Sequence, residues 1–361
     1  MAGPLNRLVV LMLFLAIAFA APAVRAADTF DVGRNFAKSY IVNSYDRLLS
    51  EADLMRDTMS ALCEAPDVDK LGHARTQFAA LVDAWSRIEF VRFGPILTDN
   101  RLDRILFFPD PRGLGQRQVQ AILANKDESA TDVTSLRAKS VATQGLAALE
   151  FVLFGANGDA LATPDGDFDC RYALAISGAV AKTAQDVLSD WDSPDSLANQ
   201  LADPEPDNPD FRTQREVLNE FIGIMVHGFE NMRDSRLSML VSETGDVNPR
   251  IALFSRSELT IEALAADVAG LHNMLLTSGI ENLMPEDQTW VVGSVDFEMQ
   301  NFLRTADEIA SEPIDELARD EDGQGKLRYL MIVTNSLQRL VVEQLAGELG
   351  LAAGFSALDG D

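Results

Sequence analysis

Apolar residues recur three and four positions apart along most of the chain, which is the spacing that gathers them on one face of an α-helix. No segment shows the alternation of apolar and polar residues that is typical of a half-buried strand. The pattern therefore predicts an all-α protein with about four main helices on each side of residue 200. The helical segments are residues 36–63, 74–94, 110–123, 134–155, 170–191, 215–240, 257–279, 290–309 and 323–350.

The segment from Asp192 to Thr213 interrupts this pattern. It is rich in proline, aspartate and asparagine, a composition that is typical of loops and linkers. We therefore expect two packed helical-bundle domains, residues 27–200 and residues 201–361.

The N-terminal residues 1–26 have the composition of a secretory signal peptide. Arg7 precedes an apolar run over residues 8–20, and the small residues Val24 and Ala26 occupy the −3 and −1 positions of a cleavage site. The run is shorter than the roughly 20 residues that a membrane span needs, and no later stretch is long enough. We expect cleavage after Ala26, a periplasmic location and no transmembrane segment in the mature chain.

The chain is strongly acidic, with a formal net charge of −26. Cleavage after Ala26 would remove two arginines and no acid, which changes the charge to −28. A field of this sign repels nucleic acid and favours cations or basic partners, although it is equally typical of a solvated surface that keeps a protein soluble. No nucleic-acid partner is expected.

Two cysteines, Cys63 and Cys170, remain in the mature chain. In an oxidising compartment they are expected to form one disulfide, the alternative being two buried free thiols. There is no CxxC motif and no cluster of cysteine and histidine, so a structural zinc site is not indicated.

The apolar stretch from Gln144 to Gly155 carries one carboxylate, Glu150, and Ala147 lies three residues earlier on the same helix face. An ionised carboxylate among apolar residues is costly unless it is paired or metal-bound. Glu150 is therefore either a structural carboxylate satisfied by an arginine or a helix terminus, or a ligand in a binding site.

Two further groups carry candidate chemistry. Glu89 and Arg92 are spaced as a helical i, i+3 pair beside Trp85, which indicates a partly buried network or an ordinary surface ion pair. Asp110 and Arg112 lie on a turn rich in proline and glycine, which either lines a site or has only a structural role.

One literal HxxE occurs, at His227 and Glu230, and its spacing would let both side chains reach one metal ion. A chance match is the alternative in a chain this acidic. His73 and His272 have no partner at ligand spacing. No GxSxG, Walker or HExxH motif is present, so neither a serine hydrolase nor a nucleotide enzyme is indicated.

Several blocks, in this order along the chain, resemble the imelysin family: AWSRIEFVRFGPI, RILFFPDPRG, QGLAALEFVLFG, RSELTIEALAADVAGLHNML and the terminal LGLAAGFSALDGD. The resemblance covers roughly residues 30–361. It implies two helical bundles with a site in the cleft between them, an association with bacterial iron uptake, and a metallopeptidase assignment that depends on a GxHxxE motif. On this chain the motif spans Gly145 to Glu150, and Ala147 occupies the histidine position.

Alanine offers no ligand atom, so the metal pair of the motif cannot form, and a peptidase needs a metal or a base to activate water. We therefore expect a non-peptidase binding protein associated with iron uptake, with iron or another divalent metal, haem or a peptide as candidate ligands. One alternative is a metallopeptidase with a rearranged site at His227 and Glu230. Another is a scaffold for an envelope protein partner, with a vestigial cleft. The expected cleft residues are Glu150, Glu89, Arg92, Trp85, Asp110, Arg112, Arg256, Ser257 and the terminal carboxylates Asp359 and Asp361.

Overall fold

The computed structural model describes residues 27–242 and 247–351, and the expected signal peptide lies outside this part of the chain. The described residues form helices and connecting turns, with one isolated antiparallel bridge between Val241 and Val247 and no β-strand. The prediction of an all-α protein is confirmed. None of the described helices combines the length and the apolar character that crossing a bilayer requires.

The first half of the chain contains the following helices: α1 (Ala27–Arg34), the π-helix η1 (Asn35–Val42), α2 (Asn43–Glu64), α3 (Val68–Ser86), the 3-10 segment η2 (Gly94–Asn100), α4 (Arg101–Ile105), α5 (Leu114–Asn125), η3 (Glu128–Ala130), α6 (Val133–Arg137), η4 (Val141–Thr143), α7 (Leu146–Phe154), η5 (Gly158–Ala162), η6 (Pro164–Gly166), α8 (Asp167–Trp191) and α9 (Leu197–Ala202). The second half contains α10 (Gln214–Asn231), the π-helix η7 (Met232–Leu237), α11 (Ser238–Leu240), η8 (Pro249–Ile251), α12 (Thr260–Ser278), η9 (Ile280–Leu283), α13 (Trp290–Ile309), α14 (Ile314–Leu317), α15 (Glu321–Arg339), the π-helix η10 (Leu340–Leu345) and α16 (Ala346–Glu348).

Helix α2 is the centre of the first half and packs against both α3 and α8. Its apolar stripe, with residues such as Leu48, Met55 and Leu62 at helical spacing, is fully buried. Cys63, near the end of α2, is joined by a disulfide to Cys170 in the first turn of α8. The predicted disulfide is therefore confirmed, and it ties two helices of one bundle together.

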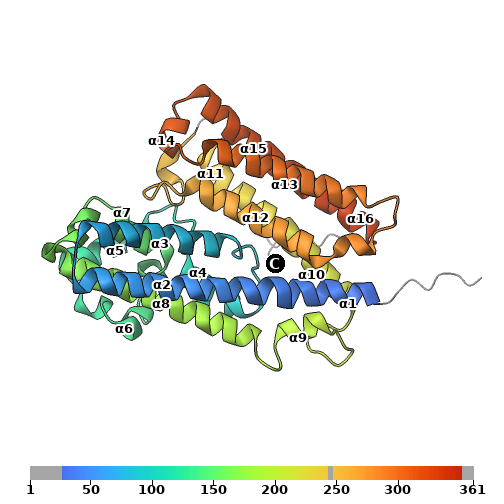
Figure 1. The fold of residues 1–361 in the computed structure, drawn as a ribbon, viewed down its shortest axis with the longest axis horizontal. Coiled ribbons are helices and arrows are strands. Elements are labelled where there is room, and N and C mark those ends of the chain that lie inside the picture. Colours follow the sequence, from blue (N-terminus) through green and yellow to red (C-terminus); the bar gives the residue numbers. More distant parts are fainter. Residues whose placement is uncertain (1–26, 243–246, 352–361) are drawn as a thin grey trace, which may run out of the picture.

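Helices α12, α13 and α15 form a second layer, drawn in orange and red above the blue and green helices in Figure 1. The two layers meet where η1 and α3 pack against α12. Gly270 permits this approach, because a Cβ atom there would lie 2.4 Å from the carbonyl oxygen of Arg87. The buried apolar core is continuous across the two layers, and a domain boundary near residue 200 stays a prediction.

Three of the differences between the described helices and the predicted segments are large. The segment 134–155 is not one helix, because the chain turns at Gly145, whose φ of +82° is outside the helical region. The segment 74–94 is helical only as far as Ser86, so Glu89 and Arg92 lie in the turn that follows α3. The interrupted segment 192–213 contains α9, which packs against α1 and η1.

Candidate functional site

Helix α7 carries the motif that the sequence singles out, and its N-terminus is held by tight backbone packing. A Cβ atom on Gly145 would lie 2.6 Å from the carbonyl oxygen of Ile105 and 2.7 Å from that of Arg104. A side chain is therefore excluded on steric grounds as well as by the positive φ. The glycine of the motif has a structural reason that is independent of any ligand.

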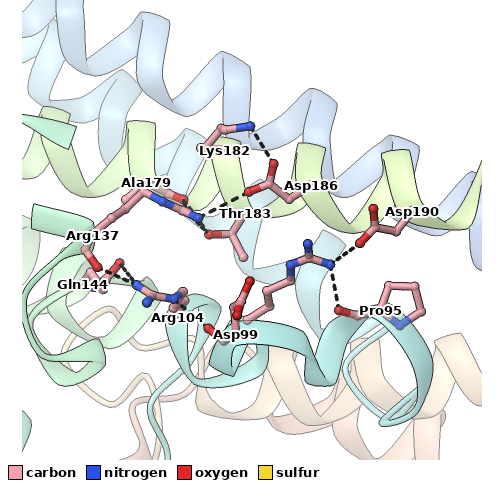
Figure 2. Close-up of polar contacts among 11 residues, drawn as sticks. Pro95, Asp99, Arg104, Arg137, Gln144, Ala179, Lys182, Thr183, Asp186 and Asp190 are labelled. Atoms are coloured by element: carbon pink, nitrogen blue, oxygen red, sulfur yellow. Dashed lines mark hydrogen bonds and ion pairs between the residues drawn. The ribbon is translucent and has the colours of Figure 1, made fainter. Parts of the chain in front are cut away.

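Arginine side chains anchor the loop that leads into α7. The guanidinium of Arg104 donates to the carbonyl oxygen of Arg137 at 2.8 Å and lies 3.4 Å from Oε1 of Gln144 (Figure 2). Arg137 in turn donates to Thr183 Oγ1 at 2.6 Å and pairs with Asp186, both on α8. This network fixes the start of α7 against the long helix α8.

Glu150 is nearly completely buried, at 3% exposure, and its carboxylate is tied to the segment that precedes α12. Its Oε1 accepts hydrogen bonds from the backbone N–H groups of Arg256 and Ser257, both at 3.0 Å, and from the Ser257 hydroxyl at 2.9 Å. Within the described part of the chain, Oε2 accepts none. Three of the expected cleft residues are thus in direct contact.

The electrostatic state of Glu150 is set by opposing effects. Burial raises the pKa of its carboxyl, whereas the hydrogen bonds from Ser257 and the positive charge of Arg256 lower it, with burial the larger effect. The Arg256 guanidinium also lies 5.1 Å from the centroid of the Phe151 ring and donates to Gln116 Oε1 at 3.2 Å. The arginine is therefore held in place from two sides.

A cavity of about 280 Å³ lies beside this contact. Its walls come from α7, from the segment between Phe107 and Val119, and from the segment between Ile251 and Arg256. Glu150 and Ala147 both line it. The motif helix therefore faces a cavity, and at the histidine position of the motif the cavity wall is a methyl group.

Asp110 also lines this cavity, but its carboxylate is engaged. It accepts hydrogen bonds from the backbone N–H groups of Leu114 and Gly115, both at 2.8 Å, at the start of α5. Arg112 is exposed, is not among the lining residues, and contributes its carbonyl oxygen to a hydrogen bond from Arg117. The turn is thus mainly structural, with Asp110 at the edge of the site.

Trp85, Glu89 and Arg92 line a second, smaller cavity of about 80 Å³. The Phe108 side chain lines both cavities, so the two adjoin. The expected helical pair of Glu89 and Arg92 is not formed. Arg92 Nε instead donates to the backbone oxygen of Glu89 at 3.3 Å.

The carboxylate of Glu89 is paired with Arg236, and both side chains are buried. Arg236 lies on the π-helix η7, and its guanidinium is 5.9 Å from the Phe108 ring centroid. Single-turn π-helices are frequent at functional sites.

Arg236 was not predicted, because nothing in the local pattern distinguishes it from a surface arginine. Asp267, on α12, was also missed, although an isolated acid in an apolar helix is the same signal that identified Glu150.

The predicted ligands His227 and Glu230 lie in contact with each other, and a metal role for them stays a prediction. His227 Nδ1 lies 3.1 Å from Glu230 Oε2, and the second oxygen of Glu230 accepts from Gln338 Nε2 at 2.8 Å. Across residues 27–242 and 247–351, no three or more His, Cys, Asp or Glu side chains are grouped as a metal site. The motif pair does not suit a metal either, because Ala147 offers no ligand atom. Asp359 and Asp361 lie outside the described residues.

The comparison with known proteins supports the same family. A family model described as Imelysin matches residues 41–341. An imelysin-like protein from Psychrobacter arcticum 273-4 has a similar fold, with a TM-score of 0.75, 20% identity, and coverage of 91% of this chain and 98% of that chain. A protein from Parabacteroides distasonis ATCC 8503, provisionally named an iron-regulated protein A precursor, has a TM-score of 0.72 at 13% identity, with coverage of 90% and 95%. No curated protein matches. The chain therefore belongs to the imelysin family.

Proposed function

We propose that this chain is an exported imelysin-like binding protein of bacterial iron acquisition, and that it binds its ligand without cleaving peptides. The observation that carries the proposal is the wall of the larger cavity, where the family's motif helix presents Glu150 but has Ala147 in place of the histidine. The link to iron rests on the name of one structural relative, which calls that protein iron-regulated.

The proposed absence of peptidase activity is supported by the donor atoms available. A metal that activates water is usually held by three protein ligands, commonly histidine and carboxylate. Among the described residues that line this cavity, the acids are Glu150 and Asp110, and there is no histidine or cysteine. Both carboxylates already accept hydrogen bonds from backbone N–H groups. A tightly held catalytic metal is therefore not expected here.

The same features suit the binding of a small ligand. A volume of about 280 Å³ is just below the roughly 300–1,000 Å³ that is common for ligand pockets, so it suits a small ligand or part of a larger one. Aromatic side chains, including Phe107, Phe108 and Phe151, supply apolar walls, while Glu150 supplies one desolvated carboxylate. We infer a ligand that places a donor or positively charged group against Oε2 of Glu150, such as part of a peptide, an iron complex or the edge of haem.

The test is titration of the purified mature protein with ferrous iron, ferric iron, haem and a short unfolded peptide, each measured by calorimetry. We expect at least one to bind with a dissociation constant below about 1 mM. Glu150→Gln should weaken that binding at least about tenfold, because it removes the charge but keeps an oxygen for the Ser257 contacts. Asp307→Asn, at an exposed site, is the matched control and should leave binding unchanged. Failure of all four to bind would refute the proposal.

A rearranged metallopeptidase is the competing function, and the 3.1 Å contact between His227 and Glu230 is the observation in its favour. It predicts metal-dependent cleavage of an unfolded protein that is abolished by His227→Ala. Our proposal predicts that wild type and His227→Ala both leave the substrate intact in the presence of zinc or ferrous ions.

A further inference from the structure

Asp267 is the most deeply buried acid outside the site described above. It lies on α12 at 1% exposure, and within the described part of the chain neither of its carboxylate oxygens accepts a hydrogen bond. An ionised carboxylate in such a position would carry the full cost of desolvation without a donor to offset it. Some neighbouring group must therefore offset the cost of burying the Asp267 carboxyl.

The carboxyl of Glu89 is that group, because it neighbours Asp267 closely enough for its charge and a side-chain hydrogen bond with it to raise the pKa of Asp267. Glu89 is itself 1% exposed, and while its Oε1 is paired with Arg236, its Oε2 is buried with no donor. Two ionised carboxylates cannot bond to each other, since both only accept. One added proton lets two of these three unsatisfied oxygens join in a carboxyl–carboxylate hydrogen bond.

The summed charge of Glu89, Asp267 and Arg236 also favours one bound proton. Arg236 is a buried cation, 5% exposed on its side chain, that pairs with this cluster. With both acids ionised the buried cluster would carry a net charge of −1, and with one proton it is neutral. Buried like charges that share a site do not both ionise at ordinary pH.

We propose that Glu89 and Asp267 share one proton at neutral pH, and that this proton joins the turn after α3 to helix α12 as a pH-sensitive contact between the two layers of the fold. The inference is independent of which ligand the larger cavity binds. Glu89 comes from the first half of the chain and Asp267 from the second, so loss of the proton sets two negative charges against each other at the junction. As with any such coupled pair, the proton belongs to both residues together.

The other charged and titratable groups around Asp267 do not replace the proton. Arg92 lies near enough to favour the ionised acid, but it is exposed and therefore screened by solvent. The Tyr40 hydroxyl, from η1, donates to the backbone oxygen of Arg87. The Arg87 guanidinium is paired with Asp83 at 2.9 Å. Burial and the neighbouring Glu89 charge raise the pKa of Asp267 well above its ordinary value, which agrees with the geometry.

The sign of the pH dependence follows from linkage. Between the pKa of an unfolded aspartate, about 3.9, and the raised pKa of Asp267 in the folded protein, the native state binds one proton more than the unfolded state. Stability is therefore greatest at the acid end of this window and falls as the pH rises. The folding constant should decrease by up to about tenfold per pH unit from this source.

The experiment compares urea unfolding of the full mature chain from pH 5 to pH 9 in wild type, Asp267→Asn and the exposed control Asp307→Asn. Asparagine has the shape of aspartate, cannot ionise and can donate to Glu89 Oε2. We expect Asp267→Asn to be more stable relative to wild type at pH 9 than at pH 5 by at least about tenfold in the folding constant. Asp307→Asn should follow the wild-type profile.

Infrared spectroscopy gives a second measurement that does not depend on unfolding. The difference spectrum between wild type and Asp267→Asn at pH 7 should contain the band of one protonated carboxylic acid, since a band from any other buried acid, such as Glu150, cancels in the difference. If that variant does not fold, Glu89→Gln should show the same loss. Parallel stability profiles for wild type and Asp267→Asn, or an unchanged infrared band in the variant, would overturn the proposal.

Discussion

Ser257 donates two hydrogen bonds to a single carboxylate oxygen of Glu150, one from its backbone nitrogen at 3.0 Å and one from its hydroxyl at 2.9 Å. The two residues are 107 positions apart in the chain. This contact links the motif helix α7 to the segment that precedes α12, and it holds Glu150 at the cavity wall. Hydrogen bonds from the protein itself thus set the position of the motif glutamate.

The contact predicts a cost for removing the Ser257 hydroxyl. Ser257→Ala deletes one hydrogen bond to a buried carboxylate while the backbone bonds remain, so the free energy of unfolding should fall by about 1–2 kcal/mol. Ser255→Ala, two residues earlier on the same cavity wall, is the matched control and should change it by less than about 0.5 kcal/mol. Urea denaturation at pH 7 measures both, and equal values for the two variants would contradict the assignment.

Restoring the motif histidine should create metal affinity that wild type lacks. Ala147→His places an imidazole three residues before Glu150 on the same helix face, which is the spacing of an HxxE pair. We expect zinc to bind this variant at least about tenfold more tightly than wild type, by calorimetry.

Ala147→Asn serves as the control for that experiment, because it adds a polar side chain without an imidazole. The zinc affinity of Ala147→Asn should equal that of wild type. Equally tight zinc binding by wild type and Ala147→His would show that the metal is held elsewhere.

Replacement by alanine should have opposite effects on stability at the motif glycine Gly145 and at the helical glycine Gly72. Gly145→Ala should lower the free energy of unfolding by more than about 2 kcal/mol, because its φ of 82° and ψ of −174° form a backbone conformation open essentially only to glycine, which costs other residues about 1–3 kcal/mol, and because the new Cβ meets two carbonyl oxygens. Gly72→Ala should instead raise it by about 0.5–1 kcal/mol, since Gly72 lies within α3 with nothing within 4 Å of its Cβ position. Thermal and urea unfolding of the two variants compare these effects directly, and a change of the same sign at both sites would be inconsistent with the packing described.

The disulfide predicts a large loss of stability when it is removed. Cys63 and Cys170 close a loop with a sequence separation of 107. On the chain-entropy model, replacing both with alanine should lower the free energy of unfolding by about 4–5 kcal/mol. Wild type measured with a reducing agent should show a similar loss, and the double variant should not respond to the reductant. A decrease of less than about 1 kcal/mol in the free energy of unfolding would mean that the disulfide contributes little to the stability of this fold.

The all-α fold was predictable because helical periodicity is local and repeats along the chain. The positions where the predicted helices are interrupted were harder to recognise from the sequence. Gly145 interrupts a segment whose apolar spacing continues through it, and the reason is the close approach of two carbonyl groups from residues some 40 positions earlier. The turn after Ser86 was missed for a related reason, since the apolar residues that follow it are buried without being helical.

The candidate site was predictable in part. Glu150 stood out as a single acid in an apolar helix, and the family resemblance led to Arg256 and Ser257. The partner of Glu89 was not predictable, because Arg236 lies 147 positions away and is brought close only by the packing of η7. Pairings of this kind depend on tertiary structure, and a local spacing rule favoured Arg92 instead.

The location of the ligand is the most direct test of the proposed function. Amide hydrogen exchange of the mature protein, measured with and without saturating ferric iron, ferrous iron or haem, identifies the backbone that each ligand protects. We predict protection of residues 147–151 and 254–257, on the two walls of the Glu150 cavity. Protection confined to the surroundings of His227 and Glu230, with the Glu150 cavity unaffected, would contradict this account.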